Sequence, residues 1–298
     1  MLKDASSPTS ARTLTILSLL LVMLLWGSTY VVTKVVIAEV PPLLLAFLRF
    51  VIASAILVAL AQARGGTHLL PRPIPWGALA AMGFTGVTVF YVGFNSALAN
   101  TTASAASLLQ ASAPAITAVL AAAFLGERVR PRRGVGLALA LVGAALVVLA
   151  SVGSSDAPNP LLGDLLMLLA VLAWAVYTIL GKGLAAIPPL ALTAYGGVLG
   201  TLFLVPAAAY DLATRPPTHV SLATLLAILY LGAGPSALNY LLWNRALRVL
   251  DAGAVANFLN LVPLFGVASA TLFLGEALVP TQLLGGALVL AGVWLSSG

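Results

Sequence analysis

The sequence of 298 residues contains no cysteine, which excludes a disulfide framework, thiol catalysis and a metal site with cysteine ligands. Its two histidines, His68 and His219, lie in separate polar segments, so no metal centre is predicted. A phosphate-binding loop of the form G-x-x-x-x-G-K-[ST] is also absent. We therefore expect no cofactor, and we do not expect ATP to be the direct source of energy.

Charged residues are scarce as well. They make up 7% of the chain, compared with about 25% in a typical soluble domain, whereas 61% of the residues are hydrophobic. The mean hydropathy is +1.10. So little polar surface cannot cover a soluble globule, and we predict a protein embedded in a lipid bilayer. The net charge of +6 does not indicate a nucleic-acid partner, because the basic residues lie at the ends of apolar runs.

Turn and charge clusters divide the chain into ten apolar runs, and a helix needs roughly 20 apolar residues to cross a bilayer. Lipid tolerates only helices or closed barrels, and these runs lack the alternation of barrel strands, so we predict an all-α membrane protein. The first run is interpreted as a retained helix, because no A-x-A-like cleavage site closes it. The ten predicted transmembrane helices are 14–35, 42–63, 76–98, 102–125, 134–152, 161–182, 189–210, 221–244, 252–274 and 281–297.

The basic residues indicate the orientation of the chain. With a cytoplasmic N-terminus, only Lys34 and Arg215 face outward and Arg49 lies within a helix, while the other basic residues fall in cytoplasmic segments. This asymmetry follows the positive-inside rule. We therefore predict a multi-pass protein of the bacterial cytoplasmic (inner) membrane with both termini in the cytoplasm. The oligomeric state is left open.

Two apolar stretches correspond to each other. Residues 23–34 read MLLWGSTYVVTK and residues 171–182 read VLAWAVYTILGK, so that Trp26 matches Trp174 and Lys34 matches Lys182. Each lysine is interpreted as a cation at a helix C-terminus, with a stem long enough to reach interfacial water. Almost the same offset relates Gly83 to Gly232, Tyr91 to Tyr240, Asn95 to Asn244, Pro114 to Pro263, Glu127 to Glu276 and Gly143 to Gly292.

This correspondence predicts that residues 1–152 and residues 153–298 each form one five-helix repeat. Because five is an odd number, the second repeat must enter the membrane from the opposite side. The pair is then an inverted repeat, on which many secondary transporters are built. We predict that the two inverted repeats surround a central cavity.

A family resemblance rests on two matching segments. The run LLQASAPAITAVLAAAFLGERVRPRRGVGLALALVGAALV and its counterpart FLNLVPLFGVASATLFLGEALVPTQLLGGALVLAGVWL resemble the paired signature of the EamA-like branch of the drug/metabolite transporter superfamily. The FLRF at residues 47–50 resembles the second helix of that family. The resemblance implies a ten-helix carrier around a central cavity, with export of amino acids and other metabolites as its activity. Aromatic and neutral amino-acid exporters are the most similar members.

Aromatic and amide side chains are expected to line this cavity. Trp26 and Trp174 lie near the middle of their predicted helices, away from the interfacial belt where membrane tryptophans concentrate. A buried indole also needs a partner for its N–H. Ordinary helix packing is the alternative explanation. The expected cavity residues are Trp26, Tyr30, Tyr91, Ser107, Gln110, Trp174, Tyr177, Tyr240, Trp243, Asn257 and Asn260.

Prolines accompany the polar residues among them. Pro114 and Pro263 should each free the backbone carbonyl four residues earlier and bend the fourth and ninth helices. The freed carbonyls and nearby amides cannot face lipid, so they should face a watery cavity or bond to other helices. Arg49 has two interpretations: it could meet a substrate carboxylate, or it could snorkel or bond to a backbone carbonyl.

Glycines weaken the third and eighth helices at corresponding places. Gly83 and Gly86 lie in the third, and Gly232 and Gly234, followed by Pro235, lie in the eighth. We predict hinges there, with close helix packing as the alternative.

These features favour a secondary transporter that exports small neutral or zwitterionic metabolites, including aromatic amino acids, by alternating access. The expected partners are a small-molecule substrate and the lipid bilayer. A channel, or an exporter of other drug-like or nucleotide-derived metabolites, is the alternative. An enzyme is not expected, because the helices carry no nucleophile, metal set or paired acids. All eight acidic residues lie in loops or near helix ends, and Glu127 and Glu276 are interpreted as helix caps. With no proton relay in the sequence, exchange driven by the gradient of the solute is predicted.

Overall fold

Proline marks the start of several helices. The computed structural model describes residues 8–125, 131–154, 157–184, 186–250, 255 and 258–297. Proline suits the first position of a helix, because the N–H that it lacks would have no partner there. The helices that begin at a proline are α1 (Pro8–Val36), α2 (Pro42–Gln62), α7 (Pro131–Ser154), α8 (Pro160–Gly183), α9 (Pro189–Thr214) and α14 (Pro280–Ser297).

The other membrane stretches are built from consecutive segments, and a short helix, η1 (Gly66–Leu69), follows α2. The third stretch consists of α3 (Trp76–Gly83), η2 (Phe84–Val89) and α4 (Phe90–Asn100). The fourth consists of α5 (Ala103–Gln110) and α6 (Ala113–Leu125). The eighth consists of α10 (Leu222–Leu231), η3 (Gly232–Leu238) and α11 (Asn239–Val249). The ninth contains η4 (Phe258–Asn260) and α13 (Leu261–Leu274).

These stretches coincide with the ten runs predicted from the sequence. Eight are long and apolar enough to cross a membrane, and Phe258–Leu274 and Pro280–Leu295 are shorter apolar helices. Within the described residues there is no strand. The prediction of an all-α membrane protein is confirmed. Helix ends differ by a few residues: α1 begins at Pro8, because the polar residues before the apolar run continue the helix.

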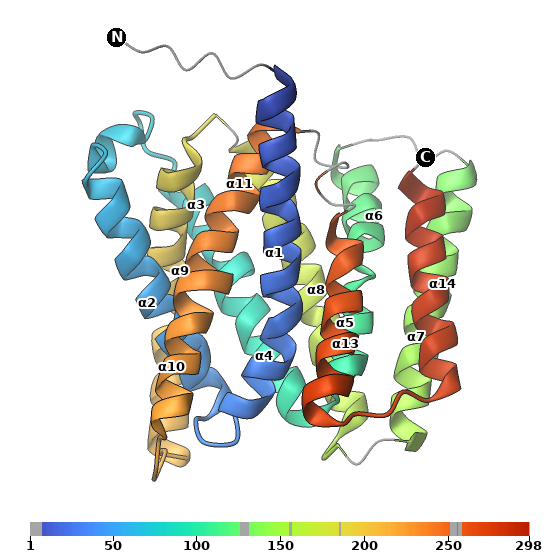
Figure 1. The fold of residues 1–298 in the computed structure, drawn as a ribbon. Coiled ribbons are helices and arrows are strands. Elements are labelled where there is room, and N and C mark those ends of the chain that lie inside the picture. Colours follow the sequence, from blue (N-terminus) through green and yellow to red (C-terminus); the bar gives the residue numbers. More distant parts are fainter. Residues whose placement is uncertain are drawn as a thin grey trace.

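The helices stand side by side in one bundle (Figure 1). At one edge α7 packs against α14, and toward the opposite edge α2 packs against α9. Between these pairs stand α1, α4, α5, α8, α11 and α13. The chain enters α1 and leaves α14 at the same end of the bundle, as expected for an even number of crossings.

Large apolar side chains cover the outside of the bundle. Leu17 and Leu24 on α1 are 57% and 50% exposed, and Leu272 and Phe273 on α13 are 78% and 77% exposed. A soluble protein rarely exposes so many large apolar residues along its helices. These faces are suited to contact with lipid, and the chain is a multi-pass membrane protein.

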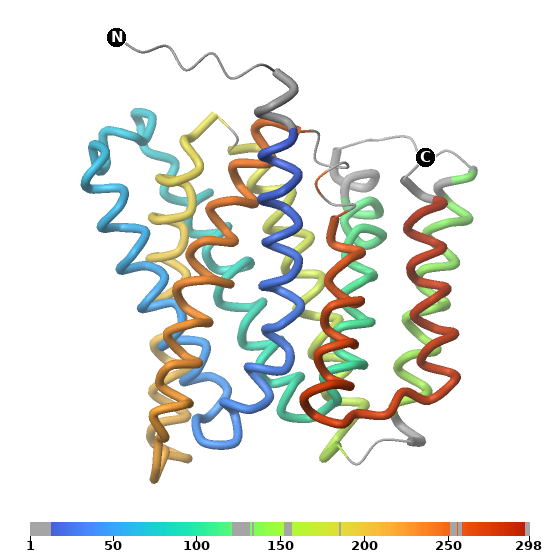
Figure 2. Tube along the Cα trace, in the orientation of Figure 1, coloured from blue at the N-terminus to red at the C-terminus, as the bar shows by residue number. Residues whose placement is uncertain are grey.

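Two π-helical segments lie at corresponding positions in the two halves: η2 begins at Phe84 and η3 at Gly232. In η3, Pro235 has no N–H to donate, and near η2 the Thr85 hydroxyl donates to the carbonyl of Ala81 at 2.8 Å. Both features disturb the regular ladder of helix hydrogen bonds. Figure 2 shows the chain passing through both segments without reversing its direction.

The predicted hinge glycines lie in or next to these π-helical segments, and most of them pack tightly. A Cβ on Gly86 would lie 2.1 Å from the ring of Tyr177, and one on Gly232 would lie 2.7 Å from Cβ of Ile52. Gly234 has more room, with its nearest neighbour 3.8 Å away. Close packing is therefore present at these positions, and hinge motion stays a prediction.

The fourth and ninth stretches are interrupted near their prolines. α5 ends at Gln110, and α6 begins at Ala113, directly before Pro114. Between them, the N–H groups of Ala111 and Ser112 bond to carbonyls only three residues back. α5 and α6 are therefore separate helices at the place where the sequence predicts a bend, and the bend itself stays a prediction. In the ninth stretch, α13 begins two residues before Pro263.

Carboxylates from distant parts of the chain cap several helix N-termini. Glu276 accepts hydrogen bonds from the backbone N–H groups of Ala103 and Ser104 at 2.9 and 2.8 Å, at the start of α5. Asp211 accepts from two N–H groups in the first turn of α2. A carboxylate is favourable there because N–H groups without helical partners point at it. The predicted capping role of Glu276 is confirmed, and Glu127 lies outside the described residues.

The ammonium group of Lys34 contacts the C-terminus of a helix, as the carboxylates contact helix N-termini. Lys34 lies in the last turn of α1, as predicted, and is half-buried. The Nζ atom donates to the carbonyls of Leu98, at 2.7 Å, and Thr101, at the end of α4. A cation is favourable at carbonyls that have no helical partner. Lys34 therefore ties the end of α1 to the end of α4.

Glu39 should make stability depend on pH. The backbone N–H of Ser221, and then the Thr224 hydroxyl, lower the pKa of this carboxyl below its ordinary value of 4.5. A lowered pKa in the folded state stabilises the protein above the unfolded pKa, and this contribution is lost as the pH falls through the folded pKa. Glu39→Gln should therefore lower the unfolding midpoint at pH 7 and have a smaller effect below pH 4. Thermal unfolding in detergent measures both; a difference that does not vary with pH contradicts the assignment.

Candidate functional site

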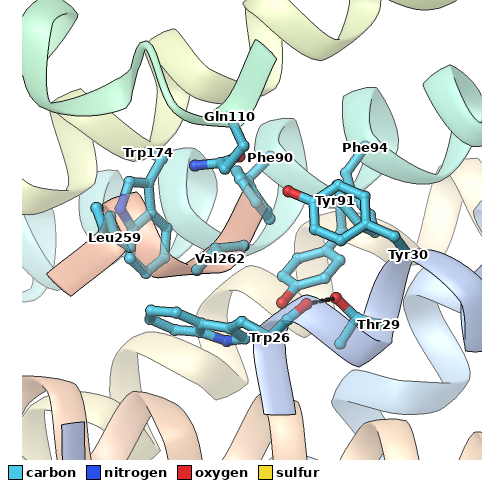
Figure 3. Close-up of a pocket in the computed structure, with 10 residues that line it drawn as sticks. All are labelled: Trp26, Thr29, Tyr30, Phe90, Tyr91, Phe94, Gln110, Trp174, Leu259 and Val262. Carbon is cyan, nitrogen blue, oxygen red and sulfur yellow. Dashed lines mark hydrogen bonds between the residues drawn. The ribbon is translucent and has the colours of Figure 1, made fainter. Parts of the chain in front are cut away.

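A cavity lies among side chains of α1, α4, α5, α8 and the ninth stretch (Figure 3). Its space, including the part that opens to solvent, is about 400 Å³. The lining residues are Trp26, Thr29, Tyr30, Phe90, Tyr91, Phe94, Gln110, Trp174, Leu259 and Val262.

Residues predicted from the sequence make up half of this lining: Trp26, Tyr30, Tyr91, Gln110 and Trp174. The others were missed. Phe90 and Phe94 lie on the same helix as Tyr91, and Thr29 follows Trp26 by one turn. Phe94 and Thr29 each lie three residues after a predicted residue, which is a usable signal because such residues share a helix face, whereas Phe90 is adjacent to Tyr91 and gives no such signal. Leu259 and Val262 carry no signal that separates a cavity wall from a packed core.

The rings beside this cavity form a continuous wall. The centroids of Trp26 and Trp174 are 5.2 Å apart with their planes nearly perpendicular, and Tyr177 stacks on Trp174 at 5.0 Å. Trp243 lies 5.3 Å from Trp26 and 5.8 Å from Trp174, and Tyr240 lies 5.5 Å from Trp174. Such contacts hold each ring in one orientation. Trp243, a predicted cavity residue, therefore supports the wall from behind.

A second cavity, with about 330 Å³ of space including the part that opens to solvent, is lined in part by Tyr240. It holds two further predicted residues, Tyr177 and Tyr240, together with Ser236. The amide of Asn244 fixes Tyr177 by donating to its hydroxyl at 3.1 Å and to that of Thr193 at 2.8 Å. The predicted residues are thus divided between two neighbouring cavities.

The two π-helical segments each offer a carbonyl to an aromatic side chain. The indole N–H of Trp26 donates to the carbonyl of Pro235 in η3 at 3.0 Å, and the hydroxyl of Tyr240 donates to that of Gly86 in η2 at 2.7 Å. Trp174, the counterpart of Trp26, is 3% exposed, and its indole N–H has no partner among the described residues. The equivalent tryptophans are therefore bonded differently.

Gln110 supplies the amide of the first cavity. Its side chain is 5% exposed and extends into the cavity from α5 (Figure 3). The oxygen Oε1 is buried without a hydrogen-bond partner in the part of the chain that the structure describes. A buried acceptor left unpaired is costly, so a ligand donor is its natural partner.

The remaining predicted polar residues do not line either cavity. The hydroxyl of Ser107 donates to the carbonyl of Ser104 at 2.9 Å. A Cβ atom added to Gly266 would lie only 2.6 Å from the Cβ of Ser107. This is the close helix contact that small residues permit. In η4, the Oδ1 atom of Asn260 is buried and has no hydrogen-bond partner in the part of the chain that the structure describes. Asn257 lies outside the described residues.

Arg49 on α2 is completely buried, with 0% exposure. Its Nε donates to the hydroxyl of Ser236 at 3.0 Å, and its Cζ lies 4.3 Å from the centroid of the Tyr91 ring. Neither Nη1 nor Nη2 has a hydrogen-bond partner among the described residues. The interpretation that this side chain snorkels is therefore wrong, because the guanidinium lies inside the helix bundle.

Comparison with known proteins identifies relatives over nearly the whole chain. A family model described as the EamA-like transporter family matches twice, at residues 13–149 and 161–298. A solved crystal structure with 23% sequence identity has a TM-score of 0.68 and covers 95% of this chain and 96% of that chain. At this identity the likeness concerns the fold alone.

Three curated relatives are closer in sequence. An uncharacterized transporter of Archaeoglobus fulgidus is 35% identical over 94% of this chain and 96% of its own. A probable terminal-alkyne amino-acid exporter of Streptantibioticus cattleyicolor is 32% identical over 93% of this chain and 91% of its own. A probable amino-acid metabolite efflux pump of Salmonella typhimurium is 30% identical over 93% of this chain and 92% of its own.

Proposed function

Since this chain belongs to the EamA-like transporter family, we propose that it is a secondary transporter that exports small neutral or zwitterionic metabolites by alternating access. Amino acids, including aromatic ones, are the proposed substrates. The family membership makes the chain a membrane transporter rather than an enzyme. It also implies a small-molecule substrate and a lipid environment.

The residues that line the first cavity support the proposal about the substrate. Of the residues that line the first cavity, none is charged, most are aromatic, and Gln110 contributes an unpaired amide oxygen. Aromatic rings give contact area for an apolar body, and an amide orients a polar group without placing a charge in the membrane. A solute with an apolar body and an ammonium group fits this combination. The printed names of two relatives, which concern amino-acid export, agree with it.

The correspondence between the halves supports alternating access. One family model matches each half, and η2 and η3 occupy corresponding places. We propose that residues 1–152 and 153–298 are inverted repeats that exchange conformations around the cavities. The placement of the basic residues supports cytoplasmic termini in the inner membrane.

Counterflow in proteoliposomes tests the transport activity. With unlabelled L-phenylalanine inside, labelled L-phenylalanine should enter faster than into vesicles without internal solute, and its entry should saturate. Such acceleration arises only in a carrier whose binding site returns across the membrane with solute bound. Liposomes without the protein are the control. Flux that rises linearly with concentration and ignores internal solute would instead identify a channel, and counterflow with other drug-like solutes but not phenylalanine would favour the other substrate class.

The same vesicles test energy coupling. Among the buried acids within the described membrane helices, Asp164 is the best candidate for a proton-relay group. Its Oδ1 accepts a hydrogen bond from the hydroxyl of Thr101 at 2.7 Å. That contact lies near the start of α8, away from both cavities, as the sequence predicted for the acids. Counterflow should therefore proceed without a pH difference, and an imposed pH gradient should produce no accumulation. Uphill accumulation that is abolished by Asp164→Asn would contradict this uncoupled mechanism.

A further inference from the structure

Arg49 is the clearest unmatched charge inside the bundle. Resting on the transport function proposed above, we propose that its guanidinium binds the carboxylate of the transported solute. The substrates would then be zwitterions or organic acids with an apolar body. The guanidinium is buried, its outer donors are unused, no described residue provides a counter-charge, and two residues that it contacts line the two cavities.

The hydrogen-bond geometry leaves the outer part of the guanidinium unused. Nε is occupied by the hydroxyl of Ser236, whereas Nη1 and Nη2 are buried without partners among the described residues. A planar guanidinium is suited to bind a carboxylate through two parallel N–H···O bonds. Leaving such donors unpaired in a membrane protein is costly, because neither water nor lipid replaces the missing acceptors. The arrangement therefore lacks an acceptor that a bound anion would supply.

Protein acids do not supply the counter-charge within the described chain. The carboxylates of Glu39, Asp211 and Glu276 hold helix N-termini, and Asp164 is bonded to Thr101. The ionisable groups that face Arg49 are the hydroxyls of Tyr91, Tyr240 and Tyr230. A neutral phenol does not balance a guanidinium charge, so no residue in the described part of the chain supplies the negative charge that a bound carboxylate would bring.

The position of Arg49 connects it with both cavities. The ring of Tyr91 covers the guanidinium on one side and lines the first cavity, and Ser236 holds Nε and lines the second. Tyr91 is the second residue after η2, and Ser236 lies within η3. Movement of either π-helical segment would therefore shift a residue that contacts Arg49. A solute with its rings against Trp26 and its carboxylate toward Arg49 would extend past Tyr91.

The first arm of the test uses the wild-type protein. Counterflow of labelled L-phenylalanine is measured in competition with unlabelled L-phenylalaninamide, which lacks the carboxylate, and 3-phenylpropionate, which lacks the amine. We expect 3-phenylpropionate to compete and the amide to compete at least about tenfold more weakly than phenylalanine, the factor expected from losing a charge-assisted hydrogen bond. Equal competition by phenylalanine and its amide would overturn the role of Arg49.

The second arm uses variants. Arg49→Gln should lower phenylalanine counterflow about tenfold or more and remove the preference for a carboxylate, and Arg49→Lys should restore only part of it because ammonium lacks the planar fork. Arg64→Gln, the same change at an exposed position just beyond α2, should have no effect. The charge of Arg49 has no counter-charge among the described residues, so Arg49→Gln should fold, with an unfolding midpoint at least equal to that of the wild type.

The outcomes separate the two proposals. A wild-type protein that exchanges no phenylalanine refutes the proposed function for this solute. Wild-type exchange that Arg49→Gln leaves intact refutes the carboxylate site alone. Should the variant fail to fold, Arg49 has a structural role, and the wild-type competition between phenylalanine and its amide still decides whether a carboxylate is recognised.

Discussion

Trp174→Ala should raise the KM for phenylalanine counterflow about tenfold or more, because the change removes a wall of the first cavity. The indole lies within 5.0–5.8 Å, between ring centroids, of five other aromatic rings. Each such ring contact contributes about 0.5–1.5 kcal/mol beyond its buried area. Removing the indole both deletes contact area for the solute and frees its neighbours to move. Initial rates of counterflow over a range of phenylalanine concentrations measure the effect.

Two variants separate the role of Trp174 in the site from its role in stability. Large-to-small changes of buried aromatic residues cost about 3–5 kcal/mol, so the folded fraction must be measured by size-exclusion chromatography. Trp174→Phe keeps a ring and loses no hydrogen bond seen among the described residues, and should retain most of the activity. Trp76→Ala, at a position 48% exposed, should leave the KM unchanged. Normal kinetics in folded Trp174→Ala would remove this residue from the proposed site.

Gly83→Ala should destabilise the protein by about 1–3 kcal/mol, the usual cost of overpacking a tight contact. A Cβ on Gly83 would lie 2.2 Å from the carbonyl oxygen of Gly196 and 2.7 Å from the N atom of Gly200. Both obstacles are backbone atoms of α9, so no side chain can turn away to make room. Alanine therefore has to push α3 away from α9. The shift of the unfolding midpoint in detergent measures this cost.

Gly77→Ala provides the matched control on the same helix. Nothing lies within 4 Å of the Cβ that alanine would add there. Alanine in an exposed helix position is more favourable than glycine by about 0.5–1 kcal/mol, so this variant should be as stable as the wild type or more stable. If both variants shift the unfolding midpoint alike, the close approach of α3 and α9 is not what constrains residue 83.

The membrane spans could be predicted from the sequence because lipid allows few solutions. An apolar run of sufficient length must be a helix, and proline, charge clusters or polar turn residues such as those of ALANTT mark where it ends. The interruption before Pro114 also follows from local chemistry, since proline cannot donate to a carbonyl four residues back. Both features depend only on neighbours in the chain.

The site was predicted less completely, because the same residue types serve in packing and in cavities. Trp26 and Trp174 were identified by their correspondence and their mid-span positions, but Phe90 and Phe94 have the composition of any apolar helix. Ser107 was assigned to the cavity and instead bonds within its own helix and packs against α13. Polarity alone does not reveal which side of a helix faces open space.

The unequal hydrogen bonds of the two central tryptophans have a consequence for observing transport. Trp26 donates to Pro235, while the corresponding carbonyl of Gly86 accepts from Tyr240, and the N–H of Trp174 has no partner among the described residues. If the halves exchange conformations as we propose, these roles should be interchanged, so that Trp174 becomes the bonded indole and Trp26 the unbonded one. The indole N–H groups of Trp26 and Trp174 thus act as a pair of internal probes: in the same motion, one gains a hydrogen bond while the other loses one. The state of the carrier can therefore be followed spectroscopically without an attached label.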